Sequence, residues 1–238
     1  LTPEVDAGLS DAARGLPDTD WHIPQLYNFA REMGISVLVG NYSRFVIDLN
    51  RPPDNQALYT TATTGLYPET LFDGTPTFIP GKTPTPAQRE GYLHNIWQPY
   101  HNNIQQELAR LKQQHGYALL FDAHSIASVI PRLFDGQLPD MNLGTNDGVS
   151  CSTAITRRLT ECCQAQSAFS WVLNGRFKGG YITRAYGRPE AGQHAIQLEL
   201  AQCNYMDEQP PFGWREDKAA RLQPLLRQLI GTLLKGPH

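Results

Sequence analysis

A short apolar run, residues 117–121, begins after Gly116 and stops abruptly at Asp122 and His124. A run of this length between a turn residue and polar residues predicts a buried strand. In open α/β sheets, ligands bind at the carboxyl ends of such strands. Asp122 and His124 are two residues apart, so on an extended strand their side chains point the same way. This motif indicates either a metal ligand with a carboxylate neighbour, or a capping Asp beside a hydrogen-bonded histidine of no catalytic importance.

Strand and helix patterns alternate along the rest of the chain. Further strands are predicted at residues 35–39, 45–49, 171–173 and 195–200. Helices are predicted at residues 22–33, 86–114, 150–166 and 216–235, the second of them kinked or divided at Pro99. Long Pro- and Gly-rich loops are predicted at residues 52–86 and 131–148. The alternation, without a repeat or a linker, predicts a single α/β domain over residues 1–238, with a mostly parallel sheet and helices on both faces.

Composition and charge exclude several classes of protein. With 40% hydrophobic and 18% charged residues, the chain has the composition of a globular enzyme and not that of a disordered protein. A net charge of −3 and the lack of a Lys- or Arg-rich run argue against a nucleic-acid partner. No apolar stretch approaches the roughly 18 residues of a spanning helix. We therefore expect no membrane partner. The four cysteines lack CxxC spacing, so we expect reduced thiols in a cytoplasmic protein. The sequence does not indicate an oligomeric state.

Acidic residues precede the first predicted helix. Asp18, Asp20 and His22 lie within five positions of one another. An Asp before a helix often caps its first amides, and this is one interpretation of Asp18. Carboxylate and imidazole groups are also common ligands of zinc and other divalent ions, which is the functional interpretation.

The predicted strand at residues 45–49 is bordered by Arg44 and Arg51 and contains Asp48, with Asn50 following it. A guanidinium group at a sheet edge can bind a carboxylate with two hydrogen bonds. The structural alternative is an ion pair between Asp48 and an arginine that only fixes the turn.

Two further groups of residues could take part in chemistry. Gln197 and Glu199 alternate with apolar residues on the strand 195–200, so they share one face. A carboxylate in a sheet is costly unless it meets a charged group, so Glu199 is either a base beside a metal or half of an ion pair. The segment from Lys178 through Gly179 and Gly180 to Arg184 predicts an anion-binding loop or an exposed hairpin.

Several segments, in the same order, resemble the N-formylglutamate deformylase family, amidohydrolases that end one route of histidine degradation. They are DTDW (18–21), YSRFVIDLNR (42–51), WQPYH (97–101), DAHS (122–125), LPDMNLGTNDG (138–148), NGRFKGGYITR (174–184) and HAIQLE (194–199). The resemblance implies a phosphorylase/hydrolase-like α/β fold related to zinc carboxypeptidases and amidases, with one catalytic Zn²⁺ or another divalent metal. The family begins with an apolar strand ending in a Pro-His-Ser-Gly-like turn, so we expect that strand and its metal-binding His to lie upstream of Leu1.

The resemblance also implies roles for residues of this chain. Asp20 or Asp18, together with His124, would bind the metal, and Glu199 would act as the general base. The substrate, a small dicarboxylate, would be bound by cationic, amide and hydroxyl groups and a tight turn: Arg44, Asn50, Arg51, Asn142, Thr145, Lys178, Gly180 and Arg184. The implied reaction is hydrolysis of N-formyl-L-glutamate to formate and L-glutamate. The alternatives are a related zinc amidase or carboxypeptidase-like hydrolase of another N-acyl amino acid, and a metal-free binding protein.

Overall fold

The computed structural model describes residues 1–58 and 63–237. The chain forms two compact units, each assembled from separate stretches of sequence. Unit 1 comprises Leu1–Thr19, Gly40–Gln105 and Val129–Gln137, and unit 2 comprises Asp20–Val39, Gln106–Ser128 and Leu138–His238. A single domain over residues 1–238 stays a prediction.

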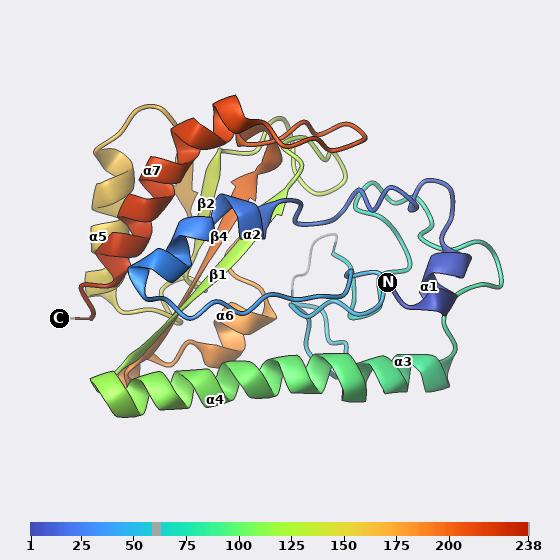
Figure 1. Ribbon diagram of the computed structural model, residues 1–238, viewed down its shortest axis with the longest axis horizontal. Coiled ribbons are helices and arrows are strands. Elements are labelled where there is room, and N and C mark those ends of the chain that lie inside the picture. The colour runs from blue at the N-terminus through green and yellow to red at the C-terminus, as the bar shows by residue number, and fades with distance from the viewer. Residues whose placement is uncertain (59–62, 238) are drawn as a thin grey trace. The chain divides into compact units, whose positions relative to one another are not determined.

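Unit 2 contains a four-stranded sheet with the order β1-β4-β2-β3 (Figure 1). The strands are β1 (Ala118–Ile126), β2 (Met141–Gly144), β3 (Trp171–Leu173) and β4 (Gln193–Ala201). β1 pairs with β4 in parallel and β2 with β3 in parallel, whereas β2 and β4 are antiparallel. The α/β class is therefore confirmed, but the sheet is mixed. Sequence patterns located β1, β3 and β4 and missed β2, which lies inside the predicted loop 131–148.

Strand β4 is buried along almost its whole length, because both faces of the sheet are covered. Helices α5 (Thr153–Gln164) and α7 (Glu216–Leu233) lie on one side, and the short α6 (Tyr181–Tyr186) lies on the other, against β4 and β1 (Figure 1). Ser152 caps α5 by accepting a hydrogen bond from the Ile155 amide. Apolar residues at helical spacing turn α5 and α7 toward the core that they share with β2 and β4.

One long helical stretch contributes to both units. It begins with α3 (Pro86–Tyr92), continues through a π-helical turn (Leu93–Trp97) and ends with α4 (Gln98–His115). Thr85 and Gln88 form a capping box at its start. The π turn ends two residues before Pro99, where an α-helix would lose a hydrogen bond and place the proline ring against a carbonyl of the preceding turn. The predicted kink or division at Pro99 is therefore replaced by a local change in helix type.

The remaining sequence predictions need correction. Residues 35–39 and 45–49 are not strands: the first segment has no regular secondary structure and is largely exposed, and the second forms a buried turn in unit 1. The predicted helix 22–33 is divided into α2 (Ile23–Leu26) and a 3-10 helix (Asn28–Met33). Besides β2, the elements that were not predicted include α1 (Pro3–Gly8), α6, and short 3-10 helices at Pro189–Ala191 and Gln202–Asn204. Residues 59–62 of the predicted loop 52–86 lie outside the described residues.

Among the described residues, no helix combines the length and the apolar composition needed to cross a bilayer.

Candidate active site

Polar side chains line one face of the central strands in two neighbouring rows. His124 on β1 is in register with Glu199 on β4, which in turn pairs with Asn142 on β2. Two residues earlier on β1 and β4, Asp122 is in register with Gln197. Because side chains on a strand alternate between faces, residues two apart share a face with their cross-strand partners. The sheet therefore gathers an imidazole, two carboxylates and two amides on one face, although His124 and Glu199 are 75 positions apart in the sequence (199 − 124).

His124 lies between two carboxylates. Its Nε2 is 2.9 Å from Oδ1 of Asp122, and its Nδ1 is 3.4 Å from Oδ2 of Asp20. Burial alone would lower the pKa of His124, but the two carboxylates outweigh burial and raise that pKa well above its usual value. Negative charge therefore concentrates around this imidazole.

Asp20 is held beside β1 by the backbone and by Tyr205. The Ser125 amide donates to Oδ1 of Asp20 at 2.6 Å. The hydroxyl of the fully buried Tyr205 lies 2.9 Å from the Trp21 carbonyl and 2.7 Å from Oγ of Ser125. Since a carbonyl can only accept, the Tyr205 hydroxyl donates to Trp21 and accepts from Ser125. The Asp20–Trp21 segment is thus fixed to the end of β1, next to His124.

Glu199 is buried, and its carboxylate is held by Gln197. Nε2 of Gln197 donates to Oε2 of Glu199 at 3.1 Å, and Oε1 of Gln197 accepts from the Gly180 amide at 2.7 Å. On the neighbouring strand, the side-chain nitrogen of Asn142 donates to the carbonyls of Pro139 and Glu199. Oδ1 of Asn142 is buried without a hydrogen-bond partner among the described residues, so it could accept a bond from a ligand or a water molecule.

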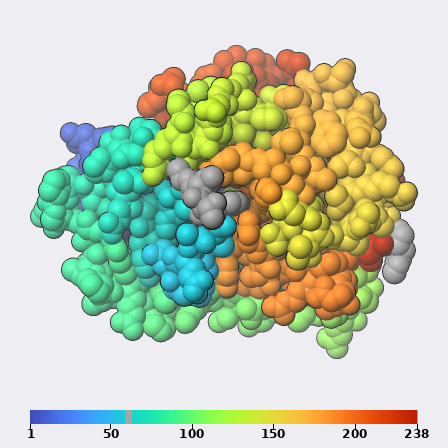
Figure 2. All heavy atoms as spheres, turned by 180° about the vertical axis from the view of Figure 1, so that it is seen from behind, coloured from blue at the N-terminus to red at the C-terminus, as the bar shows by residue number. Residues whose placement is uncertain are grey.

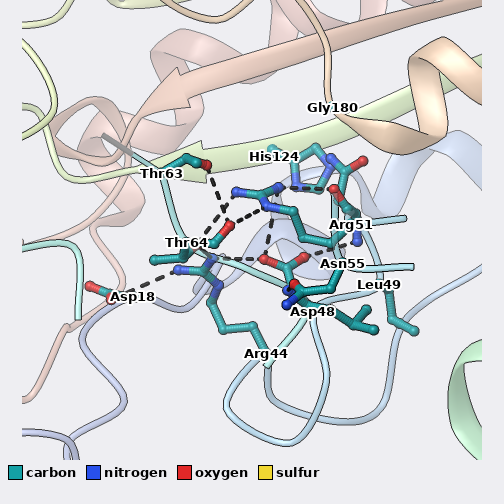
Figure 3. A network of polar contacts seen from close by, with 12 residues as sticks. Asp18, Arg44, Asp48, Leu49, Arg51, Asn55, Thr63, Thr64, His124 and Gly180 are labelled. Atoms are coloured by element: carbon teal, nitrogen blue, oxygen red, sulfur yellow. Dashed lines mark hydrogen bonds and ion pairs between the residues drawn. The ribbon is translucent and has the colours of Figure 1, made fainter. Parts of the chain in front are cut away.

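In unit 1, Arg44 and Arg51 are both directed at Asp48 (Figure 3). Nη2 of Arg44 donates to Oδ2 of Asp48 and to the Thr64 hydroxyl, each at 2.7 Å. Nε of Arg51 donates to the Thr64 carbonyl at 2.8 Å, and its Nη1 lies 3.9 Å from Asp48. The backbone N–H of Asn50 donates to the other oxygen of Asp48, Oδ1. These contacts have the form of the structural alternative, an ion pair that fixes the turn.

The pKa values of the two acids in this cluster shift in opposite directions. Burial raises the pKa of Asp48, but Arg51, Arg44 and two hydrogen bonds outweigh burial and lower that pKa to about 2. Asp18 accepts a hydrogen bond from the Phe72 amide at 2.7 Å and lies 3.8 Å from Arg44. For Asp18, burial prevails and its pKa is raised. Asp18 does not cap a helix, since α2 has His22 at its N-cap without a side-chain capping bond.

The remaining predicted substrate-binding residues of unit 2 make internal contacts. Thr145 is buried, and its hydroxyl accepts from the Asn174 side chain and from the Gly148 amide. Lys178 forms an exposed ion pair with Asp147 at 3.0 Å. In Figure 2, the yellow and orange segments that contain these two residues lie next to each other at the surface. Nε of Arg184, on α6, donates to the Gly179 carbonyl at 3.0 Å.

A divalent metal fits this arrangement in donor type. His124 and Asp20 offer the imidazole nitrogen and carboxylate oxygen that zinc takes, and Asp122 could orient the imidazole. Within residues 1–58 and 63–237, no group of three or more His, Cys, Asp or Glu side chains has the arrangement of a metal site. The described chain therefore supplies a pair of candidate ligands.

Sequence reasoning placed Asp122, His124, Gln197 and Glu199 on strand faces, and the structure joins these faces. The sequence analysis gave no role to Gln197 and did not identify Tyr205. The alternation of Gln197 and Glu199 on an apolar strand was a usable signal for the first residue. Tyr205 had none, because its contact with Trp21 joins positions 184 residues apart.

Comparisons with known proteins identify the family of the chain. Residues 1–206 match the profile of the N-formylglutamate amidohydrolase family. The chain is 60% identical to an N-formylglutamate deformylase of Pseudomonas aeruginosa and 58% identical to one of Pseudomonas putida, in each case over 98% of this chain and 88% of the relative. A crystal structure of an N-formylglutamate amidohydrolase from Ralstonia eutropha has the same fold, with a TM-score of 0.77, 23% identity, and coverage of 99% of this chain and 84% of that one. A protein from Agrobacterium tumefaciens has a TM-score of 0.69 at 17% identity, over 97% of this chain and 82% of that one. By its profile match and its close relatives, the chain belongs to the N-formylglutamate amidohydrolase family.

Proposed function

We propose that this protein hydrolyses the formamide of N-formyl-L-glutamate to formate and L-glutamate. Family membership and the names of the Pseudomonas relatives support this substrate. The observation that carries the mechanism is the register of β1 and β4, which makes His124 and Glu199 cross-strand neighbours.

Glu199 is the general base in this proposal. It accepts a proton from the water that attacks the formyl carbon, and it returns the proton to the departing nitrogen, so that L-glutamate leaves as a neutral amine. Its burial and its hydrogen bond from Gln197 support this role, because a base must be held in a defined orientation to transfer protons efficiently.

His124 and Asp20 would hold a divalent metal, zinc or another, together with at least one further ligand. The negative charge that Asp20 and Asp122 place around His124 favours a cation there. When bound, such an ion supplies Lewis acidity at the carbonyl under attack. Asp122 would orient the imidazole through its 2.9 Å contact with Nε2.

Substrate carboxylates need cationic partners. In unit 2, Arg184 stands on α6, next to the Gly179–Gly180 turn that contacts Gln197. Contacts between the substrate and the other predicted binding residues stay predictions; these residues are Arg44, Asn50, Arg51, Asn142, Thr145 and Lys178. So do the cytoplasmic location and the place in histidine degradation.

The test is formate release from N-formyl-L-glutamate by the purified protein. Turnover of N-acetyl-L-glutamate and of N-formyl-L-aspartate is measured separately for comparison. We expect rapid release from the first compound only. Equal turnover of the acetyl compound would favour the broader amidase. Elemental analysis should find about one divalent metal per chain, and removal of the metal by a chelator should abolish turnover and readdition should restore it.

The base is tested by Glu199→Gln, which keeps the shape of the side chain but removes its ability to accept a proton. We expect turnover to fall by roughly 10²- to 10⁴-fold while metal content stays unchanged. Glu190→Gln is a matched control, because Glu190 is exposed in the 3-10 helix just before β4. Unchanged turnover in Glu199→Gln would refute the assignment.

A further inference from the structure

Gln197 has a side chain that connects a backbone turn to Glu199. It lies on β4, two residues before Glu199, and only 3% of its surface is exposed. Its two side-chain hydrogen bonds run in opposite senses: Oε1 accepts from the Gly180 amide at 2.7 Å, and Nε2 donates to Oε2 of Glu199 at 3.1 Å.

Only one orientation of the Gln197 amide satisfies both contacts. The Gly180 N–H is a donor and must face an oxygen, so the amide nitrogen of Gln197 faces Glu199. A carboxylate of Glu199 accepts from this nitrogen. The backbone turn therefore orients Gln197, and Gln197 holds one oxygen of Glu199.

The turn at Gly179 and Gly180 is itself fixed by neighbouring backbone. Gly179 has a φ of +111°, and Gly180 is the N-cap of α6. A Cβ atom on Gly144, which is in register with Gln197, would lie 2.6 Å from the Gly179 nitrogen. Strand β2 and the turn thus touch at a position where only a glycine fits.

We propose that Gln197 is a positioning residue, which aims the Glu199 carboxylate at the attacking water. This inference rests on the proposed function, in which Glu199 is the base. A glutamate has three rotatable side-chain bonds, and a fixed donor on one oxygen restricts the directions in which the other oxygen can point. Efficient proton transfer requires such a restriction, since an error of about 1 Å in placement can cost about 10²-fold in rate.

Gln193 provides a matched control on the same strand. It lies four residues before Gln197 and thus on the same face of β4, and its Nε2 donates to the Tyr186 carbonyl at 2.6 Å. Gln193 and Gln197 therefore attach the two ends of α6 to β4. Of the two, Gln197 is the one whose side chain donates to Glu199.

The first experiment compares Gln197→Met with Gln193→Met in the metal-loaded enzyme. Each variant loses one attachment of α6 and keeps a side chain of similar length. We expect kcat of Gln197→Met to fall about 10- to 100-fold with KM changed less than about twofold, because the base is misaimed and the substrate is still bound. Gln193→Met should retain kcat. Equal losses in the two variants would overturn the inference.

The second experiment places Gln197→Met in the Glu199→Gln background. If Gln197 acts through Glu199, the substitution should lower the residual rate of that background by less than about twofold. A merely structural role would lower both backgrounds by the same factor, which would also overturn the inference. Should Gln197→Met fail to fold, Gln197→Asn serves instead, because it keeps an amide but withdraws it by one methylene.

Failure of this inference is distinguishable from failure of the proposed function. Absence of formate release by the unmodified enzyme, or full turnover in Glu199→Gln, would contradict the proposed function. Loss of turnover in Glu199→Gln together with an unchanged kcat in Gln197→Met would contradict the role of Gln197 alone.

Discussion

Asp48 is the single side chain around which the polar cluster of unit 1 is built. It accepts from Arg44 and from the Asn50 amide, and it lies within 3.9 Å of Arg51. Substitution by Asn would leave two mostly buried guanidinium groups without their shared carboxylate. We expect Asp48→Asn to lower the free energy of unfolding by about 2 to 3 kcal/mol, measured by urea denaturation.

Asp73→Asn is the control for this substitution. Asp73 makes the same local bond, to the amide two residues ahead, but it is exposed and has no arginine ion pair among the described residues. We expect the free energy of unfolding to change by less than about 0.5 kcal/mol. A loss in Asp48→Asn no larger than that of the control would mean that the arginines do not depend on Asp48.

The sequence predicts the position and contacts of some site residues better than those of others. Asp122 and His124 were predicted to share a strand face, because two positions apart on a strand is a purely local relation. The pairing of His124 with Glu199 could only be expected through a family resemblance, since no local rule fixes which strands become neighbours. For Arg44 and Arg51 the sequence left two interpretations open. The bonds to Asp48 depend on how a turn folds, and a strand pattern does not contain that information.

Strand β2 and the Lys178–Gly180 turn approach each other through a glycine. A Cβ atom on Gly144 would lie 2.6 Å from backbone atoms of both Lys178 and Gly179. We therefore expect Gly144→Ala to displace the turn, to weaken the bond from Gly180 to Gln197, and to destabilise the protein by roughly 1 to 3 kcal/mol. Thermal denaturation and formate release would measure the two effects.

Gly91→Ala in α3 is the comparison, because the nearest atom to its Cβ would be 3.9 Å away and alanine favours a helix. This variant should be as stable as the unmodified protein or more so, with full activity. Wild-type stability and activity in Gly144→Ala would show that the turn can move without consequence.

Elements with a strong period were predicted well and elements without one were not. β4, α5 and α7 were located by apolar residues at strand or helix spacing, and β1 by an apolar run with clear ends at Gly116 and Asp122. Residues 45–47 are as deeply buried as a strand would be, yet they form a turn, because a short apolar run fits a core in either conformation. β2 has four residues and ends in glycine, which reads as a loop. α6 follows two glycines, and this concealed its start.

Stability of the complete chain should fall in acid, and Asp48 should account for a defined part of that fall. The folded pKa of Asp48 is about 2, below its ordinary value of 3.8. A depressed folded pKa contributes stability above the ordinary value, and that stability is lost as the pH falls toward the folded pKa. The shift of somewhat less than 2 units corresponds to about 2 kcal/mol, present at neutral pH and mostly lost by pH 2.

Acid denaturation of the unmodified protein and of Asp48→Asn isolates this contribution. The difference in free energy of unfolding between them should shrink by about 2 kcal/mol between pH 6 and pH 2, because only the first protein has the titrating carboxyl. Glu107 also has a pKa lowered to about 2, through its hydrogen bonds with Arg110 and Ser36, but that pair is exposed and salt should screen it. The acid-dependent difference at Asp48 should therefore persist in 0.5 M salt, where the Debye length falls to roughly 4 Å. A difference that stays constant with pH would mean that the pKa of Asp48 is the same in the folded and the unfolded protein. The ion pairs with Arg44 and Arg51 would then contribute no net stabilisation of the charged carboxylate.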